Sequence, residues 1–476
     1  MPAKKAVAKK AVAKKVSTPE VLVIGPADPK DMSFRLYVDM MVEYGIYLEA
    51  DDQDRFPTRL PRKLTGYKAI IIDKALPAAQ EIEKHPDWPK VKDRYRPYVK
   101  PKEFAWSDQR PYWVGVHHLL MVSEVTPQHP AVLARLGGRR DRDVVMGQVK
   151  NCWTDKDHAM WLRWGNDVSF VWLDGMYRAG EVFGDAQVKK NVVSAAHDIL
   201  DLFEQDRLPS SKGPNRRLHC WEFLLTLWEK TGRRDRRLYQ AAITQVPTLA
   251  AARKRAAEAY KGAPYFRAEH VGHAWTYAVV ADVLKQPAFF EAGVDYLKGA
   301  FDALFDRHKS LWAHYGRKGV SLGLPWGRGQ AWCLYGLVEL LCRLPKSHPD
   351  YELLASWVDM TCEGMRRTQD PVTGLWHTVM GEPATRIEVS SAGMLLRLLS
   401  RAWRHGCCRA EFVPEMLAAA WRGLKAHTFQ NRTCTFCWGT GEGYDAAFYA
   451  NVPCGGSPSM SFVGGASYVK AFGPLA

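Results

Sequence analysis

Apolar residues recur at helical spacing over most of the chain, from about residue 110 onward. The apolar positions follow i, i+3, i+4 and i+7, the pattern of amphipathic helices that bury one face. Clusters of Pro or Gly separate the segments. Several segments share one layout, an aromatic-rich helix followed by a short turn and a second amphipathic helix. The pattern therefore predicts repeated helical hairpins that start near residues 161, 218, 270, 328, 389 and 460, the last of them incomplete.

A single hairpin of this kind cannot bury its apolar face alone. Six hairpins can close into a double ring, with inner helices packed around an axis and outer helices covering them. We therefore expect an all-α fold, a six-hairpin (α/α)6 barrel over residues 111–476, with a ligand pocket at the mouth where the inner helices begin. An open solenoid with a long concave face is the structural alternative.

The N-terminal part has a different pattern of apolar residues. Residues 21–24 and 69–72 are short apolar runs, and residues 33–44 between them have helical spacing. Strand, helix and strand in this order predict a small α/β segment over residues 19–83. Residues 84–110 are rich in Pro, Lys and Arg and are interpreted as a linker.

Charge narrows the choice of partner. The chain has 66 Lys and Arg against 51 Asp and Glu, a net charge of +15, which favours acidic partners such as uronic acids, nucleic acid or an anionic membrane. Part of the excess lies in residues 1–18, a Lys/Ala-rich stretch interpreted as a disordered tail and not as a nucleic-acid-binding arm. No apolar run reaches the roughly 18 residues of a membrane span, so we expect a cytoplasmic protein without a membrane partner.

Ten cysteines are scattered along the chain. A protein of this size does not need disulfides to be stable, so free thiols are expected. Cys434 and Cys437 form one CxxC motif, and no second CxxC accompanies it. We therefore expect no metal site.

Five motifs in the C-terminal half resemble glycoside hydrolase families 88 and 105. Residues 324–341 contain Trp-Gly-Arg-Gly-Gln-Ala-Trp, which resembles the families' W-x-R-G-N-G-W signature, with Gln330 in place of Asn and Ala331 in place of Gly. Their G-L-F-Y-H, G-L-W-H, E-T-S-G-S-A-M and G-T-G-x-G segments are matched in order at residues 310–315, 374–377, 388–394 and 438–443. The resemblance is clear over about 270–476.

This resemblance implies an (α/α)6 barrel that acts on the ends of oligosaccharides released by polysaccharide lyases. Such oligosaccharides are acidic and end in a 4,5-unsaturated uronic acid. The families protonate its double bond and add water, and the unstable hemiketal opens and releases the sugar. The resemblance implies neither a metal nor an organic cofactor.

The catalytic carboxylates depart from the family pattern. The families use an Asp at the start of an inner helix, which falls here near residues 269–273, and a second Asp that falls near 215–219; neither stretch contains an Asp. Glu269 lies one helical turn before His273, so the two could form an acid–base pair. Alternatively, His273 only lines the mouth of the barrel. His314 matches the families' site histidine, which makes Glu269, His273 and His314 the catalytic candidates.

Four further residues are candidates for binding the substrate. The planar guanidinium of Arg328 can hold a uronate carboxylate with two hydrogen bonds, unless it forms a structural ion pair. Trp332 lies one turn further on and suits stacking on a sugar ring, as does Trp326, although both could be core residues. Tyr277 is the fourth candidate.

Three functions remain open at this point. The first is hydration-driven hydrolysis of unsaturated uronyl oligosaccharides. The second is a histidine-based epimerase or lyase on the same barrel, and the third is a non-catalytic carbohydrate-binding protein. A carboxylate within hydrogen-bond reach of the space between Arg328, His314 and Trp332 would favour hydrolysis. Two further carboxylates belong to Asp174 and Glu388. We interpret Asp174 as a core residue, and Glu388 either as a helix cap or as a partner of Arg328.

Overall fold

The computed structural model describes part of the chain, and the chain divides into two compact units, residues 1–126 and 127–476. The predicted tail over residues 1–18 and the predicted helix over 33–44 lie outside the described residues. The described residues are 21–25, 59–67, 69–98, 137–154, 167–205, 207, 221–246, 265–317, 320–383, 385, 387–426, 428–429, 432–433, 437–438, 453–454 and 460–475.

The N-terminal unit contains a small parallel sheet. Its strands β1 (Val21–Ile24), β2 (Ala69–Asp73) and β3 (Tyr95–Tyr98) lie in the order β1-β2-β3. Both predicted apolar runs are strands, and their isoleucine and leucine side chains are fully buried. The sheet is accompanied by the short helices α2 (Pro77–Glu81), η1 (Ile82–Lys84), α3 (Trp88–Val91) and η2 (Lys92–Arg94).

The beginning of the predicted linker is structured. Residues 84–98 contain α3, η2 and the third strand, although their composition resembles a linker. Val91 is fully buried, and the rings of Trp88 and Tyr95 meet edge to face at 5.6 Å. Apolar contacts of Trp88, Val91 and Tyr95 hold this segment to the sheet. These residues are difficult to recognise in the sequence because Lys, Arg and Pro residues surround them.

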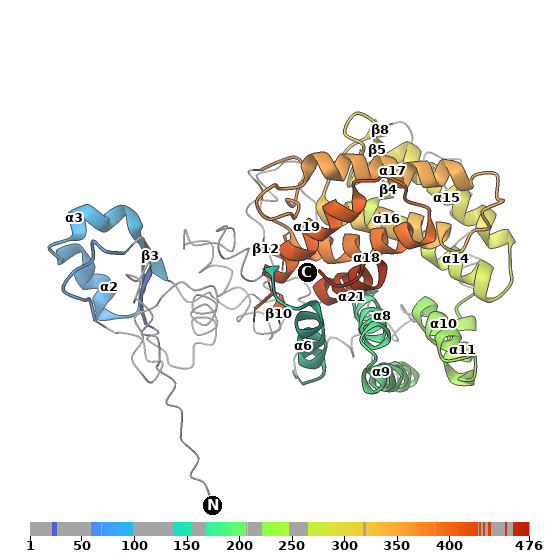
Figure 1. The fold of residues 1–476 in the computed structure, drawn as a ribbon, viewed down its shortest axis with the longest axis horizontal. Helices are drawn as coiled ribbons and strands as arrows, with labels where there is room; N and C mark the ends of the chain where they lie inside the picture. The colour runs from blue at the N-terminus through green and yellow to red at the C-terminus, as the bar shows by residue number, and fades with distance from the viewer. Residues whose placement is uncertain are drawn as a thin grey trace, which may run out of the picture. The chain divides into compact units, whose positions relative to one another are not determined.

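Six inner helices of the described residues form a closed ring in the second unit, and Figure 1 labels each of them. Each contacts the next, and the last contacts the first, so the chain closes a barrel and the open solenoid is excluded. The six helices start close to the predicted hairpin starts. They are α8 (Asp167–Val182), α10 (Trp221–Lys230), α14 (Ala274–Val283), α16 (Gly327–Leu341), α18 (Val389–His405) and α21 (Met460–Phe472).

Outer helices cover this ring. The helix α6 (Asp141–Thr154), which precedes the first predicted hairpin, packs against α21 and α8. It therefore serves as an outer helix that covers α21. The other outer helices each follow their inner partner: α9 (Ala186–Glu204), α11 (Arg236–Ile243), α15 (Ala288–Leu304), α17 (Tyr351–Thr368) and α19 (Val413–Ala426).

The second unit also contains short antiparallel strands. The strands β4 (Tyr265–Arg267), β7 (Tyr315–Arg317) and β8 (Val320–Ser321) form an antiparallel sheet in the order β4-β7-β8. A one-turn helix, α13 (Ala268–Val271), leads from β4 toward α14. The other pairs are β5 (Phe305–Asp306) with β6 (Leu311–Trp312), β9 (Thr428–Phe429) with β10 (Arg432–Thr433), and β11 (Cys437–Trp438) with β12 (Pro453–Cys454).

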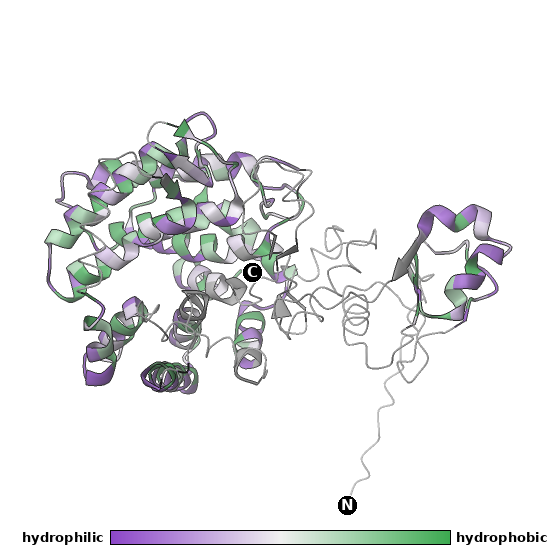
Figure 2. Cartoon of the chain, turned by 180° about the vertical axis from the view of Figure 1, so that it is seen from behind, coloured by the Kyte–Doolittle hydropathy of each residue, from purple (hydrophilic) through white to green (hydrophobic). Residues whose placement is uncertain are grey.

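Local sequence explains where the helices turn. Gly184 has a φ of +72°, a conformation that glycine adopts without steric cost. The carboxylate of Asp185 then caps α9 by accepting a hydrogen bond from the Val188 amide at 3.0 Å. Figure 2 shows that the helices carry both hydrophobic and hydrophilic stretches, as the amphipathic pattern predicts.

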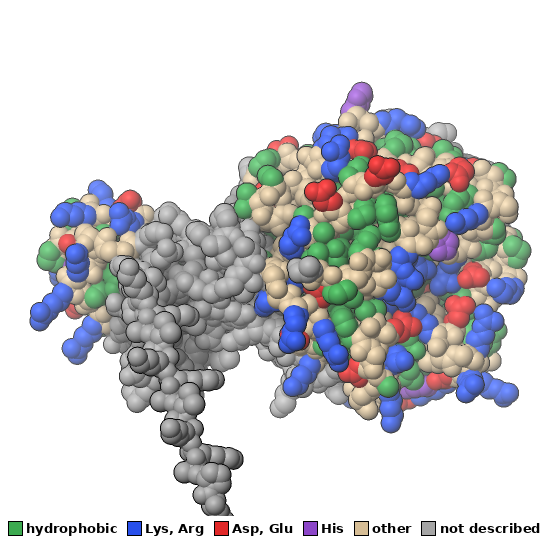
Figure 3. All heavy atoms as spheres, viewed as in Figure 1, with side chains coloured by type: hydrophobic (Ala, Val, Ile, Leu, Met, Phe, Trp, Pro, Cys, Tyr) green, Lys and Arg blue, Asp and Glu red, His purple; other side chains and the backbone are tan. Residues whose placement is uncertain are grey.

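The surface of the larger unit mixes both signs of charge. Figure 3 shows Lys, Arg, Asp and Glu side chains interspersed on the face it views, so the positive excess is not gathered into a single stripe there. In the described part of the chain, no helix has the length and apolar character that crossing a membrane requires.

Candidate active site

A carboxylate and an imidazole form the centre of the site. Both carboxylate oxygens of Glu269 lie 3.0 Å from Nε2 of His314. The His314 side chain is fully buried, whereas 31% of the Glu269 side chain is exposed. The pair therefore joins an imidazole held inside the protein to a carboxylate that solvent, and hence a ligand, can reach.

Backbone pairing brings these two residues together across 45 positions of sequence. Strand β4 ends directly before α13 and pairs with β7, with Arg267 opposite Tyr315. The Ala268 amide donates to the His314 carbonyl at 3.0 Å, and the His314 amide donates to the Leu324 carbonyl at 3.0 Å. The backbone on both sides of the pair is therefore fixed by main-chain hydrogen bonds.

Gln330 holds the segment that precedes His314. Its fully buried side-chain carbonyl accepts a hydrogen bond from the Trp312 amide at 2.8 Å, and its amide group donates to the Trp312 carbonyl. One side chain of α16 thus satisfies both backbone groups of a residue in β6. Gln330, which replaces the Asn of the signature, therefore fixes the backbone two residues before His314.

The environment of Glu269 keeps its carboxyl ionised. Burial alone would raise the pKa of Glu269, but the hydrogen bond and the charge of His314 outweigh it and hold the pKa below its ordinary value. Arg267 adds to this effect, with its Nε 4.0 Å from the carboxylate. In the free protein, Glu269 is therefore a proton acceptor.

Trp326 connects the pair to Arg328. The indole ring lies 4.7 Å from the His314 ring, and the guanidinium carbon of Arg328 lies 4.7 Å from the centre of the same indole. Trp326 is 1% exposed. Its ring therefore packs against both His314 and Arg328 and has no exposed face on which a sugar could stack. Its Nε1 has no hydrogen-bond partner among the described residues.

Trp332 lies one turn along α16 from Arg328, and both side chains are partly exposed. A Cβ built on Gly272 would lie 3.4 Å from Cε3 of Trp332, so the indole lies directly against the backbone that follows α13. Trp332 therefore packs beside the element that carries Glu269, and its partly exposed indole makes it the better of the two tryptophans for stacking.

Two predicted residues lie elsewhere. His273 is exposed, with its ring 6.1 Å from that of His270, while the imidazole at hydrogen-bond distance from Glu269 is His314. Tyr277 is 6% exposed and packs between α14 and α15 against Phe289 and Tyr296. Because α13 ends at Val271 and α14 begins at Ala274, Glu269 and His273 do not lie on one continuous helix.

Sequence reasoning missed Arg267 and Tyr315. The Arg267 guanidinium lies 5.2 Å from the centre of the Tyr315 ring and donates to its hydroxyl at 3.4 Å. The Tyr315 ring also packs at a tilt against His314, with ring centres 4.0 Å apart. Their positions next to Glu269 and His314 were the only signal, since the pairing of β4 with β7 is nonlocal. Residues 215–219 and 439–443 lie outside the described residues.

The remaining motifs support the start of α16 and α18. The Gly327 amide donates to the Thr378 carbonyl at 2.7 Å, so the segment after the Gly-Leu-Trp-His motif anchors the turn that precedes Arg328. The fully buried Glu388 accepts a hydrogen bond from the Ser391 amide at 2.8 Å. It therefore acts as the N-cap of α18, as one of its two interpretations predicted.

Asp174 belongs to an ion network inside the ring. Its carboxylate lies 2.8 Å from Nε of Arg178 and 2.9 Å from the Arg397 guanidinium, which also contacts Glu339 at 3.1 Å. Burial would raise the pKa of Asp174, but the charges of Arg178, Arg397 and Lys230 hold it well below its ordinary value. The core interpretation of Asp174 fits this arrangement.

Known proteins share the fold. Over 178 residues, the chain is 28% identical to the unsaturated rhamnogalacturonyl hydrolase YesR of Bacillus subtilis (strain 168), which covers 37% of this chain and 49% of that protein. The chain thus spans about half the length of this curated relative. A possible member of the GH105 family from Salmonella enterica superposes with a TM-score of 0.56 at 18% identity, covering 69% of this chain and 93% of that one.

A second solved structure, a family 105 glycoside hydrolase of C. acetobutylicum ATCC 824, superposes with a TM-score of 0.55 at 17% identity over 68% of this chain and 98% of its own. These likenesses confirm the predicted (α/α)6 barrel. The sequence profile of Glycosyl Hydrolase Family 88 matches residues 142–458, which is more than half of the chain. The closed ring, the motifs around Arg328 and this match together establish that the chain belongs to Glycosyl Hydrolase Family 88.

Proposed function

We propose that this protein hydrolyses oligosaccharides that end in a 4,5-unsaturated uronic acid, by hydration of the double bond at Glu269. The observation that carries the proposal is the carboxylate of Glu269 held 3.0 Å from the buried His314 at the start of the inner helices. Membership of Glycosyl Hydrolase Family 88 and the similarity to an unsaturated rhamnogalacturonyl hydrolase support it.

The pair provides one carboxyl group that can alternate between acid and base. A bound uronate adds negative charge and excludes water beside Glu269, and both effects favour the protonated carboxyl. The protonated Glu269 donates its proton to C4 of the double bond, and the resulting carboxylate accepts a proton from the water that adds at C5. One water is consumed, Glu269 regains its proton, and the hemiketal opens to release the remaining sugar.

Arg328 and Trp332 bind the sugar in this proposal. The Arg328 guanidinium is held over the Trp326 ring, and a guanidinium in a fixed plane suits the two oxygens of a uronate carboxylate. Trp332 offers a partly exposed indole on the same side of α16. An acidic oligosaccharide also agrees with the net charge of +15.

The rival functions predict a different centre. An epimerase or lyase built on histidine would require an imidazole as the reactive group, and a binding protein would require no titratable group. Glu269 is the partly exposed member of the pair and His314 is the buried one. This arrangement favours a reacting carboxylate that is oriented by an imidazole, and so favours hydrolysis.

The test is the activity of the Glu269→Gln variant on oligosaccharides produced by polysaccharide lyases. Hydration removes the conjugated double bond, so the rate is measured as loss of its ultraviolet absorbance. We expect the substitution to lower kcat by about 10²–10⁴-fold, because Gln keeps the shape of Glu but cannot exchange the proton.

A second Glu–His pair provides the matched control. Glu291 lies 3.0 Å from Nε2 of His348, and its side chain is 66% exposed. Glu291→Gln should leave the rate unchanged. Full activity of Glu269→Gln, or inactivity of the wild-type protein on both rhamnogalacturonyl and glucuronyl substrates, would exclude the proposal.

A further inference from the structure

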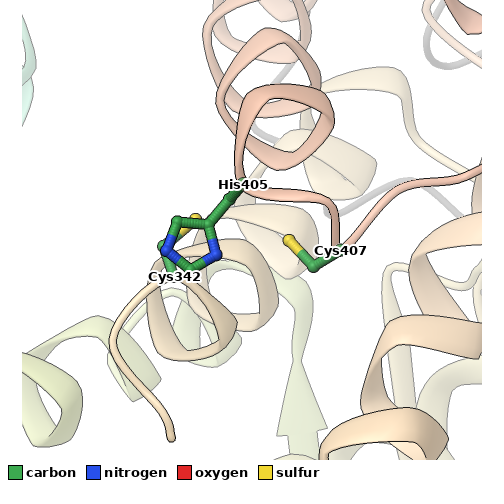
Figure 4. Close-up of side chains that lie close together, drawn as sticks. All are labelled: Cys342, His405 and Cys407. Atoms are coloured by element: carbon green, nitrogen blue, oxygen red, sulfur yellow. The ribbon is translucent and has the colours of Figure 1, made fainter. Parts of the chain in front are cut away.

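A second cluster of reactive side chains lies at the other end of α16. Cys342, His405 and Cys407 each present one potential ligand atom, and these three atoms all lie within 4.8 Å of one another. Figure 4 shows the Cys407 sulfur directed toward His405 and Cys342. Arg328 precedes Cys342 by 14 positions on one helix, a separation of about 20 Å, so the cluster is distinct from the Glu269 site.

Two rigid helix ends hold the three residues in place. Cys342 is the C-cap of α16, and its amide donates to the Val338 carbonyl at 2.9 Å. His405 is the last residue of α18. Gly406 follows with a φ of +76°, and this left-handed turn lets the Cys407 amide donate to the Ala402 carbonyl at 3.1 Å. The turn sends the Cys407 thiol back toward the helix end.

The types of ligand point to a soft divalent cation. Thiolate sulfur and imidazole nitrogen select zinc over magnesium or calcium, which prefer oxygen. Tetrahedral Zn–S and Zn–N bonds place such ligand atoms about 3.5–3.8 Å apart. The observed limit of 4.8 Å exceeds this by about 1 Å, which rotation of the exposed His405 side chain can close.

We propose that Cys342, His405 and Cys407 bind one Zn²⁺ ion, with water at the fourth position. Binding releases two thiol protons to solvent, and the two thiolates then neutralise the charge of the metal. The Arg401 guanidinium lies beside Cys342 and is also paired with the Glu339 carboxylate at 3.3 Å. The negative charges of Glu339 and of the two thiolates together balance the positive charges of Arg401 and of the ion. The site braces the ends of α16 and α18 against each other and stabilises the barrel far from the reacting sugar.

The experiment is a Zn²⁺ titration of the reduced, metal-stripped full-length protein against a chromogenic zinc chelator. We expect one high-affinity ion per chain, a thiolate-to-metal charge-transfer band when Co²⁺ replaces Zn²⁺, and an increase in Tm on adding Zn²⁺. His405→Ala should weaken binding by about 10-fold or more and reduce the increase in Tm. Because His405 is exposed, this variant tests the site without disturbing the core.

Other cysteines of the chain provide the controls. Cys362 and Cys408 form a separate buried pair with their sulfurs 3.8 Å apart, so Cys362→Ser should bind Zn²⁺ normally. Loss of binding in a Cys434→Ser/Cys437→Ser variant together with normal binding in His405→Ala would overturn the proposal. Absence of Zn²⁺ binding, or a Cys342–Cys407 disulfide that persists under reducing conditions with excess Zn²⁺, would overturn it as well.

Discussion

The barrel contains two clusters in which a carboxylate pairs with a nitrogen base, and the clusters differ in the side chain that is the partner of the carboxylate. At the mouth, the partly exposed Glu269 faces the imidazole of the fully buried His314. In the interior, the buried Asp174 and Glu339 face the guanidinium of Arg397, which stays protonated at all ordinary pH values. The first cluster can exchange a proton with a ligand, and the second cannot.

This difference separates chemistry from architecture within one fold. Removing a buried ion from its partner leaves an unpaired charge in a medium that solvates it poorly, so the interior cluster is sensitive to any single change. The cluster at the mouth can lose one partner while water replaces the missing contact. We therefore expect changes at the mouth to alter the reaction and changes in the interior to alter stability.

The largest expected effect on stability comes from Arg397→Ala. Its side chain is 2% exposed and contacts Asp174 at 2.9 Å and Glu339 at 3.1 Å. Loss of the guanidinium should lower the free energy of unfolding by about 3–5 kcal/mol, measured by denaturant titration. Arg409 is the control, because it pairs with Glu352 at 2.7 Å but is 52% exposed. Arg409→Ala should cost less than about 1 kcal/mol, and equal losses would contradict the contrast.

A smaller effect is expected at Gly336, which lies on α16 between Arg328 and Glu339. A Cβ at this position would lie 2.1 Å from the Val271 carbonyl oxygen, so Gly336→Ala must push α13 away from α16. We expect a cost of about 1–3 kcal/mol and a fall in kcat, since α13 carries Glu269. Gly293→Ala meets only side-chain atoms at 3.1 Å or more and should leave kcat unchanged. A stable, fully active Gly336→Ala protein would show that α13 does not need this close contact.

The smallest effect is a shift in pH dependence. His314 lowers the pKa of Glu269 through a hydrogen bond and its charge, so His314→Gln should raise that pKa. The limb of the kcat/KM profile that reports Glu269 should then move to higher pH, and the measurement is the rate across a pH series for both proteins. An unchanged or lower-pH limb would mean that another group controls the profile.

Much of the fold could be predicted because each inner helix carries its own apolar period. The hairpin starts expected near residues 328, 389 and 460 correspond to helices that begin at Gly327, Val389 and Met460. Glycine, aspartate and proline at the turns mark these boundaries locally. The outer role of α6 could not be predicted in this way, because its partner α21 follows some 300 residues later.

The site was only partly predictable for the same reason. Glu269, His314 and Arg328 were identified by motif and residue type, and the structure brings their elements together. The pairing of Glu269 with His314 instead of His273 depends on a β4–β7 register that no local pattern encodes. The burial of Trp326 likewise depends on packing against His314, since a tryptophan in a motif suits a core and a sugar platform equally well.

Closure of the ring has a consequence for how the protein is made. The Leu475 amide donates to the Asp141 carboxylate across 334 positions, and α21 fills the gap between α18 and α8. During synthesis, the apolar faces of α8 and α18 therefore stay uncovered until α21 is made, and α21 is translated hundreds of codons after α8. Until α21 is made, the ring cannot close, so we expect closure to be a late step of folding that depends on contacts distant in sequence.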